Sequence, residues 1–286
     1  MRSPPADKSA PRTRTGGAQS IRRAIGVLRI LAAGQDQGVR LADVVQSSGL
    51  NRPTAHRILK VLAEEGVVEQ DPASRRYLVG SEVSLLGLAR TVRVPVRAVA
   101  EPHLAQLAER IGDTVFLTVR SGADSIGVER RMGPYPVQVR AIEIGARRPL
   151  GVRMAGVMLL ACMPEEEAVQ VTRANAKRLA QHQLTPAKVL ERVRQARARG
   201  YAYTEAGVVR GTRALSVPVF DAEGRAQAAI SLAAIADRLP ASRVPAIAAQ
   251  MYAQAALVTR RLAQLARAAA REARPARGSG RGATVE

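Results

Sequence analysis

The chain has 286 residues, which is enough for two domains that each bury a hydrophobic core. Its 44 lysines and arginines outnumber its 24 acidic residues, and the formal net charge of +20 favours an anionic partner, either nucleic acid or a membrane surface. The excess of basic residues is spread along a chain that is rich in arginine and alanine. Biased codon usage in a GC-rich genome is therefore an equally good explanation of the positive charge.

Cysteine, histidine and aromatic content exclude several kinds of site. The single cysteine, Cys162, cannot form an internal disulfide, and with three histidines it offers no metal-ligand spacing, so we expect a reducing cytoplasm and no cofactor. The most apolar run, GVMLLACM, is far shorter than the roughly 20 residues of a membrane span, so no membrane partner is expected. Aromatic residues make up only 2% of the chain, which disfavours stacking on single-stranded nucleic acid and favours binding to duplex DNA.

Both ends of the chain lack residues to bury. Residues 1–19 and 268–286 combine arginine with proline, glycine and serine, so the sequence predicts disordered basic tails. The first helix is predicted from Ser20, a favourable N-cap residue, to a stop at Gly34. Its apolar residues recur at helical spacing and are expected to face the core: Ile21, Ile25, Leu28 and Leu31.

Two further helices follow the first. The segment RLADVVQSSGL predicts a short helix that ends at Gly49. The next helix opens at Asn51, whose side chain can accept a hydrogen bond from a free amide of the first turn. Pro53 suits that turn because its missing N–H costs nothing there. The predicted buried stripe of this third helix comprises Ala55, Ile58, Leu59 and Leu62.

A hairpin completes the first domain. In GVVEQDPASRRYLVG two apolar runs flank a turn, and three helices followed by a hairpin predict a winged helix-turn-helix DNA-binding domain over residues 20–81. Polar side chains around the start of the third helix would meet base edges and phosphates, and arginines at the hairpin tip could reach phosphate or the minor groove. The predicted DNA-binding residues are Asn51, Arg52, Thr54, His56, Arg57, Arg75 and Arg76. The alternative for the last two is a solvated turn with no role in binding.

The chain beyond the hairpin mixes helices with strands. A linker helix is predicted over residues 82–100, with Pro95 and then Pro102 interrupting or kinking the helical pattern. Three segments that favour strands and are punctuated by glycine follow, namely TVFLTVRSG, SIGVERRMG and PVQVRAIEIG. This mixture predicts an α+β domain over residues 101–267.

The end of this second domain is also marked by clear signals. A helix is predicted with Thr185 as its N-cap, Pro186 in its first turn and Gly200 at its end. The segments RALSVPVF and RAQAAISLAA flank DAEG, which predicts a tight hairpin. A helix over residues 240–269 then closes the fold.

These elements follow one known family in order. The segments SIRRAIGVLRILAA, GLNRPTAHRILKVLAEEGVVEQ and RRYLVGSEVSLLGLA resemble the amino-terminal domain of the isocitrate lyase regulator (IclR) family of bacterial transcription factors. Further on, PHLAQLAERIGDTVFLTVR and VPVFDAEGRAQAAISLAA resemble parts of its ligand-sensing domain, so the resemblance covers about residues 20–267. It implies a winged domain, a linker helix and a GAF-like α/β domain in which helices cover a twisted antiparallel sheet. It also implies a homodimer, often paired into a tetramer, on a double-stranded DNA operator.

The resemblance also implies a ligand pocket. In this family the pocket lies between the sheet and a loop that opens a helix, and that loop is part of RMAGV here. Backbone amides at a helix start favour an anionic group, so the expected effector is a small organic acid. The implied effector-binding residues are Arg153, Met154, Ala155, Gly156, Thr204, Ala214, Ser231 and Ala233.

The pocket departs from the family pattern in several places. Many relatives have a lysine where this chain has Val157, and Arg153 is added before the loop. Arg153 could pair with a ligand carboxylate through its planar fork, or it could face solvent. Ala214 and Ala233 occupy positions that can be polar in relatives, which favours an aromatic or branched acid over a very small keto acid.

No other feature of the sequence points to catalysis. Cys162 is expected to pack in the core, the alternative being a thiol sensor, and the acidic run at residues 164–167 suits a helix start. The sequence shows no nucleophile elbow, phosphate loop or metal cluster, so we predict an effector-responsive transcriptional regulator and not an enzyme. Two alternatives stay open, namely a constitutive architectural DNA-binding protein whose second domain senses nothing, and an enzyme acting on a small acid.

Overall fold

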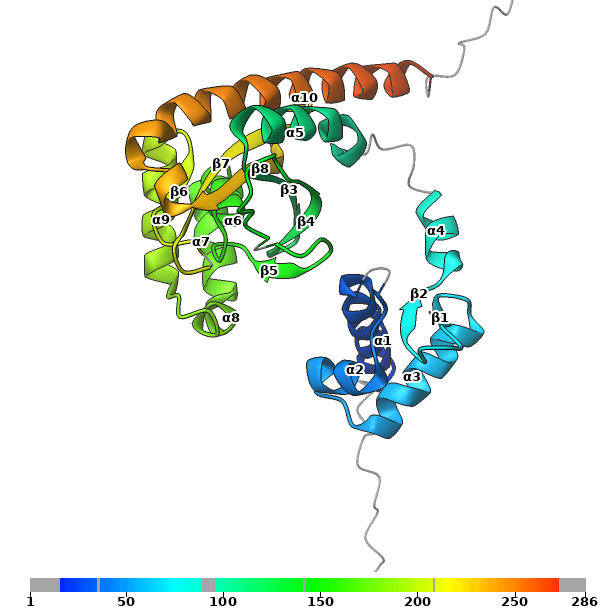
Figure 1. Cartoon of the computed structure of the whole chain (residues 1–286). Helices are drawn as coiled ribbons and strands as arrows, with labels where there is room; N and C mark the ends of the chain where they lie inside the picture. The colour runs from blue at the N-terminus through cyan, green and yellow to red at the C-terminus, as the bar shows by residue number, and fades with distance from the viewer. Residues whose placement is uncertain (1–15, 35–36, 89–95, 141, 208, 273–286) are drawn as a thin grey trace, which may run out of the picture. The chain divides into compact units, whose positions relative to one another are not determined.

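The computed structural model describes residues 16–34, 37–88, 96–140, 142–207 and 209–272, and the chain divides into two compact units, residues 1–89 and 90–286 (Figure 1). Most of the two predicted tails therefore lies outside the described residues. Within the described ranges, no helix has both the length and the apolar character needed to cross a membrane.

The amino-terminal unit is a winged helix-turn-helix domain. Its helices are α1 (Gly16–Ala33), α2 (Leu41–Ser48), α3 (Arg52–Glu64) and α4 (Ser81–Leu88), and its strands are β1 (Val68–Gln70) and β2 (Tyr77–Val79). The two strands pair in antiparallel fashion, with Glu69 opposite Leu78, and form the wing. An isolated bridge between Val39 and Tyr77 ties the wing to the connection between α1 and α2.

The core of this unit differs from the predicted one in the first helix. The helix begins at Gly16 and not at Ser20, so residues 16–19 belong to it and not to a tail. Ile21 and Ile25, expected to face inward, are 62% and 42% exposed, because the helix extends beyond the core that it shares with α2 and α3. The buried core residues are Val27, Leu31, Val44, Ala55, Leu59, Val68 and Tyr77.

The second unit is built on one six-stranded antiparallel sheet. The strands are β3 (Thr114–Ser121), β4 (Asp124–Arg131), β5 (Arg147–Pro149), β6 (Ala202–Thr204), β7 (Thr212–Phe220) and β8 (Ala226–Ile235). Their spatial order is β5-β4-β3-β8-β7-β6, so β8 lies in the centre of the sheet between β3 and β7. The late hairpin predicted around DAEG is the connection between β7 and β8.

Helices cover both faces of this sheet (Figure 1). On one face lie α5 (Val96–Ile111) and α10 (Val244–Glu272), and on the other lie α6 (Met154–Ala161), α7 (Glu165–Ala174), α8 (Ala176–Ala180) and α9 (Pro186–Arg199). Because successive side chains of a strand point to opposite faces, Ile230 and Leu232 of β8 pack under α5 and α10. Ser231 and Ala233 face the side of α6 and α9, which is where a cavity lies.

The predicted strand over residues 136–145 is absent among the described residues of that segment, and this prediction was wrong. The Gln138 side chain is bonded there in place of a strand ladder: its Nε2 donates to the carbonyls of Gly112, Gly133 and Tyr135, and its Oε1 accepts from Thr114. The two apolar side chains Val139 and Ile142 pack on Phe116 instead of alternating along a strand.

The segment between the units also differs from the prediction. The helix α5 continues through Pro102, so the predicted domain boundary after residue 100 falls inside a helix. Proline removes one helical hydrogen bond, but Ala100 and Leu104 on either side of it are fully buried, and this packing keeps the helix continuous. Pro95 lies outside the described residues. The closing helix, predicted over residues 240–269, begins at Val244 after a 3₁₀ turn and runs to Glu272.

Candidate functional site

The start of α3 is organised by its own sequence. Asn51 has extended backbone angles, and its Oδ1 accepts a hydrogen bond from the Thr54 amide at 2.9 Å, as expected of an N-cap residue. Ala55 and Leu59 anchor the helix in the core, which leaves the side chains of Arg52, Pro53, His56 and Arg57 exposed. A cluster of donors is thereby presented at the end of the helix that carries a positive partial charge.

The wing and α3 meet at one surface groove. Arg52 and His56 of α3 and Arg75 of the wing line this groove, whose other lining residues are Leu41, Pro53, Gln70 and Tyr77. Arg75 is exposed and has a positive φ of 58°. Two hydrogen bonds hold this conformation: the Arg75 amide donates to the Asp71 carbonyl, and the Gln70 side chain donates to the Arg75 carbonyl. Residues that lie far apart in sequence therefore form one basic surface.

Arg76 differs from Arg75, although both were predicted to bind DNA. Its Nη1 donates to the carbonyl oxygens of Gly38 at 3.1 Å and Gln37 at 3.4 Å, which belong to the connection between α1 and α2. The side chain is half-buried, whereas Arg75 is exposed. Arg76 thus braces the domain, because adjacent residues of a tight turn point in different directions.

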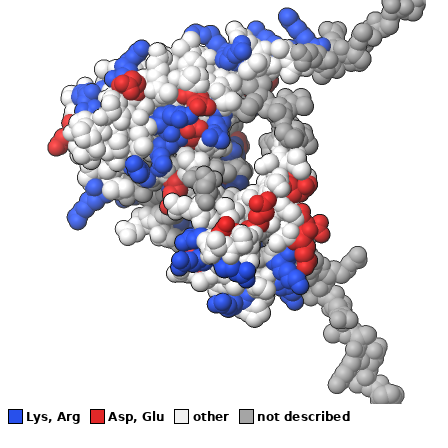
Figure 2. Space-filling model, turned by 45° about the vertical axis from the view of Figure 1, so that its right-hand side comes forward, with Lys and Arg blue, Asp and Glu red and all other residues white. Residues whose placement is uncertain are grey.

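Charge is unevenly distributed over this unit. Basic and acidic side chains gather over different parts of its surface in Figure 2. Arg52 and Arg57 stand at the start of α3, whereas Glu64 and Glu65 stand at its end, and a 13-residue helix separates its ends by about 18 Å. The basic end therefore suits a polyanion better than the acidic end does.

The second unit contains a cavity of about 410 Å³ on the side of the sheet covered by α6 and α9. Its floor is formed by strands β3, β6, β7 and β8, and its walls by the start of α6, the turn before α9, α9 itself and the connection between β6 and β7. The lining residues are Phe116, Ile142, Val152, Arg153, Met154, Ala155, His182, Gln183, Leu184, Arg192, Thr204, Ala206, Gly207, Thr212, Arg213, Ala214, Ser231, Leu232 and Ala233.

Most of the residues predicted to bind an effector line this cavity. The structure brings together Arg153, Met154, Ala155, Thr204, Ala214, Ser231 and Ala233. Gly156 is not among the lining residues. A Cβ atom at Gly156 would lie 2.9 Å from the Gly151 amide nitrogen, so this glycine allows α6 to pack closely against the preceding turn.

Sequence reasoning missed several lining residues. His182, Gln183 and Leu184 come from the turn between α8 and α9, which no motif marks. Arg192 lies three residues beyond the buried Val189 and beside the buried Val193, so an arginine at the edge of an apolar helical stripe was the signal that could have found it.

The two hydroxyls predicted to contact the ligand are already engaged. Ser231 donates to the Ser216 hydroxyl at 2.9 Å, and Ser216 in turn donates to the Ile230 carbonyl at 3.1 Å. Thr204 donates to the Ala206 carbonyl at 3.0 Å and accepts from the Ala206 amide at 3.2 Å. In these arrangements both hydroxyls can accept from a ligand, but neither has a proton left to donate to a carboxylate.

The start of α6 supplies donors in their place. Arg153 is the N-cap residue, its side chain makes no capping bond, and the amides of the first turn have no partner within the helix. Arg153 is buried, with only 7% of the residue exposed. Burial first, and then the charge of Arg148, lowers the pKa of its guanidinium to about 10, against the opposing effect of Glu143. It stays charged at neutral pH.

A second basic group comes from α9. Arg192 is half-buried, and this burial lowers the pKa of its guanidinium below the ordinary value. His182 lies in the turn before α9, where burial, followed by the charges of Arg148, Arg153 and Arg178, lowers the pKa of its imidazole. This shift favours the neutral form of the ring.

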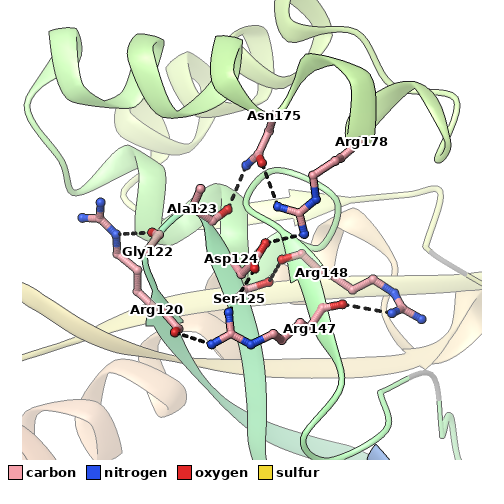
Figure 3. A network of polar contacts seen from close by, with 10 residues as sticks. Arg120, Gly122, Ala123, Asp124, Ser125, Arg147, Arg148, Asn175 and Arg178 are labelled. Atoms are coloured by element: carbon pink, nitrogen blue, oxygen red, sulfur yellow. Dashed lines mark hydrogen bonds and ion pairs between the residues drawn. The ribbon is translucent and has the colours of Figure 1, made fainter. Parts of the chain in front are cut away.

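A polar network holds the walls of the cavity in place (Figure 3). Asp124, at the start of β4, pairs with Arg147 of β5 at 3.1 Å and with Arg178 of α8 at 2.6 Å. Asn175 accepts from Arg178 at 3.0 Å and donates to the Ala123 carbonyl at 2.8 Å. One hairpin thereby anchors β5, which leads into the start of α6, and α8, which leads into the wall around His182.

Cys162, at the end of α6, packs against the core between α6, α9 and the sheet. Burial raises the pKa of its thiol to about 11, only partly opposed by the charge of Arg197. A thiol of this kind does not ionise at neutral pH, which agrees with the core position expected for it. Among the described residues, no group of three or more His, Cys, Asp or Glu side chains could hold a metal ion.

Known proteins share both units of this chain. Residues 20–72 match the IclR helix-turn-helix domain, and residues 89–260 match the family described as bacterial transcriptional regulator IclR C-terminal. The glycerol operon regulatory protein of Streptomyces griseus is 32% identical over 229 residues, 80% of this chain and 89% of the relative. The transcriptional repressor IclR of Escherichia coli K12 is 27% identical over 259 residues, 89% of this chain and 93% of the relative.

Solved structures show the same fold. An IclR transcriptional regulator from Alicyclobacillus acidocaldarius superposes with a TM-score of 0.66 at 25% identity, over 85% of this chain and 98% of that one. An IclR homologue from Microbacterium hydrocarbonoxydans, crystallised with 4-hydroxybenzoate, superposes with a TM-score of 0.64 at 21% identity, over 85% and 98%. The chain belongs to the IclR family of bacterial transcriptional regulators, with a helix-turn-helix domain and a carboxy-terminal effector-binding domain.

Proposed function

We propose that this protein controls transcription by binding operator DNA through its winged unit, with an affinity set by a small organic acid bound in the cavity of the second unit. The observation that carries this proposal is the cavity itself. It has a basic lining, the first turn of α6 opens onto it, and none of its described lining residues is Asp or Glu. An anion is the ligand that such a lining favours, because it regains there the donors that it loses in water.

The apolar part of the lining supports an acid with an aromatic or branched skeleton. Phe116 and Ile142 pack together at the floor, and Ala214 and Ala233 add small apolar surfaces beside them. A volume of about 410 Å³ lies within the usual range for small-molecule sites. The aromatic acid in the crystallised Microbacterium relative fits the same chemistry.

The DNA side of the proposal rests on the start of α3 and on the wing. We infer that the start of α3 enters the major groove, where the exposed side chains of Arg52, His56 and Arg57 contact DNA. Asn51 and Thr54 form the cap of the helix and enter the groove with it. Arg75, on the wing, contacts the phosphate backbone of the DNA. As a DNA-binding regulator, the protein acts beside the chromosome in the cytoplasm.

Two measurements on the purified full chain test this function. DNA fragments selected from a random library should share one motif bound far more tightly than bulk DNA, by about 10³-fold or more. A thermal-shift screen of carboxylic acids should then raise the unfolding temperature with at least one of them. If no motif is selected, the proposal of a sequence-specific regulator is wrong. If a motif is selected but no acid stabilises the protein, a constitutive DNA-binding protein is favoured.

A further inference from the structure

The cavity carries one buried and one half-buried cation from different walls. Arg153 precedes α6, and Arg192 lies on α9. Arg213 also lines the cavity, but its Nη1 donates to the Leu239 carbonyl at 3.2 Å, which belongs to the core on the opposite face of the sheet. For His182, burial and the neighbouring arginines lower the pKa of the imidazole, which favours its neutral form. The charge that faces a ligand is therefore that of two guanidinium groups.

Both guanidinium groups are partly stripped of water. Burial is the largest influence on each, and in both cases it lowers the pKa, which means that the charged form is less stable than in water. Arg148 adds like charge near Arg153, and the exposed Glu143 offsets only part of it. A bound anion removes this penalty for the guanidinium that it contacts.

A single carboxylate can form the planar, two-bond pairing with only one guanidinium at a time. The neighbouring hydroxyls of Ser231 and Thr204 already donate to groups of the protein, so a second anionic group has Arg192 as its natural partner. The floor of the cavity also carries apolar side chains, among them Phe116 and Ala214. The lining thus combines guanidinium groups from two walls with apolar side chains on the floor.

We propose that the effector is an organic dicarboxylate, with one carboxylate held by Arg153 and the first-turn amides of α6 and the other held by Arg192. This inference rests on the proposed function and narrows it. The carbon skeleton lies over the apolar floor, and the hydroxyls of Ser231 and Thr204 accept hydrogen bonds from hydroxyl groups on that skeleton when it carries them.

The test compares acids that carry a second carboxylate with acids that carry a hydroxyl or a methyl group in its place. Isothermal titration calorimetry of the full chain at pH 7.5 would use terephthalate against 4-hydroxybenzoate, and adipate against hexanoate. We expect each dicarboxylate to bind at least about tenfold more tightly than its partner, since one extra charge-assisted pairing is worth that much or more.

Substitutions assign the preference to its residue. In Arg192→Gln the two members of each pair should bind within about twofold of each other, because the dicarboxylate loses the partner of its second carboxylate. Arg192→Lys, which keeps the charge, should restore part of the preference. The control is Arg194→Gln on the same helix, where the side chain is 67% exposed and pairs with Glu191, and it should behave as wild type. Circular dichroism checks that each variant is folded.

The outcomes separate this inference from the function on which it rests. If monocarboxylates bind as tightly as dicarboxylates, or if the preference survives in Arg192→Gln, the dicarboxylate inference is overturned while acid sensing stands. If none of the four acids binds, the dicarboxylate inference falls as well, and the wider acid screen then decides the proposed function.

Discussion

Arginines that are equivalent by sequence in the winged unit lie in different surroundings. Arg52 and Arg57 are exposed at the start of α3, Arg75 is exposed in the wing, and Arg76 is bonded to the carbonyls of residues 37 and 38. Periodicity identified the exposed side of the helix, but it could not tell which arginine of the turn bends back on the domain. That difference depends on the positive φ of Arg75.

Replacing these arginines with alanine should separate binding from folding. Arg52→Ala and Arg57→Ala should each weaken operator binding, by about 1 to 3 kcal/mol at one position if a base is read, or uniformly with a shallower salt dependence if a phosphate is contacted. Arg76→Ala should instead lower the unfolding temperature of the winged unit, because two carbonyls lose their donor. Fluorescence anisotropy at several salt concentrations and calorimetry measure the two effects. Normal stability with lost binding in Arg76→Ala would contradict this division.

Cys162 gives a prediction for the effector unit at the same scale. Folding raises the pKa of this thiol from an ordinary value near 9 to about 11, so the thiol stays protonated across the neutral range. At pH 8 only about one thiol in a thousand is ionised, and iodoacetamide should label the native chain far more slowly than the urea-unfolded chain. Labelling at equal rates in both states would show a reactive thiol and revive the sensor hypothesis.

The elements whose ends are marked by local chemistry were predictable. Asn51 caps α3 as expected, and Thr185 and Gly200 bound α9 because the first accepts from the Lys188 amide and the second takes a positive φ. The segment 136–145 was not predictable, because its β-forming residues pack as a loop around the Gln138 network. Pro102 also misled, since tertiary packing outweighs one lost helical bond.

The candidate site was predictable to the same extent. The family register predicted Ser231 and Ala233 as lining residues, and both face the cavity because alternate residues of a strand point to the same side of a sheet. Arg192 and His182 escaped notice because no motif of the sequence marks their segments as part of a pocket. Only the packing of α9 against α6 brings these segments together.

The junction between α6 and the turn before it offers a test at the scale of an element. Gly156→Ala would place a methyl group 2.9 Å from the Gly151 nitrogen, which is too close without backbone movement. We expect a loss of about 1 to 3 kcal/mol in the free energy of unfolding, measured with urea, together with weaker acid binding. The matched control is Gly26→Ala in α1, where no atom lies within 4 Å and alanine should stabilise the helix by about 0.5 to 1 kcal/mol. Equal effects of the two substitutions would contradict the packing argument.

At the scale of the whole molecule, one winged unit presents little surface for tight and specific binding. We therefore predict a homodimer that reads a partly palindromic operator, with half-sites separated by one helical turn of DNA or a multiple of it. Light scattering at micromolar concentration should give twice the mass of the chain, or four times if dimers pair. A monomer that retains full specific affinity would contradict the prediction.

The central claim is that occupancy of the cavity changes the affinity for DNA. The measurement that tests it most directly is operator affinity of the full chain, by fluorescence anisotropy, with and without a saturating acid taken from the binding screen. The claim predicts a shift of roughly 5- to 150-fold.

Two variants tie that shift to the cavity. Ala214→Leu, which fills the cavity from a half-buried position on its floor, should abolish the shift and leave the affinity without acid close to the wild-type value. Ala222→Leu, in the exposed turn between β7 and β8, should keep the shift. An affinity that does not change when the acid is bound, or a shift that survives in Ala214→Leu, would contradict the account.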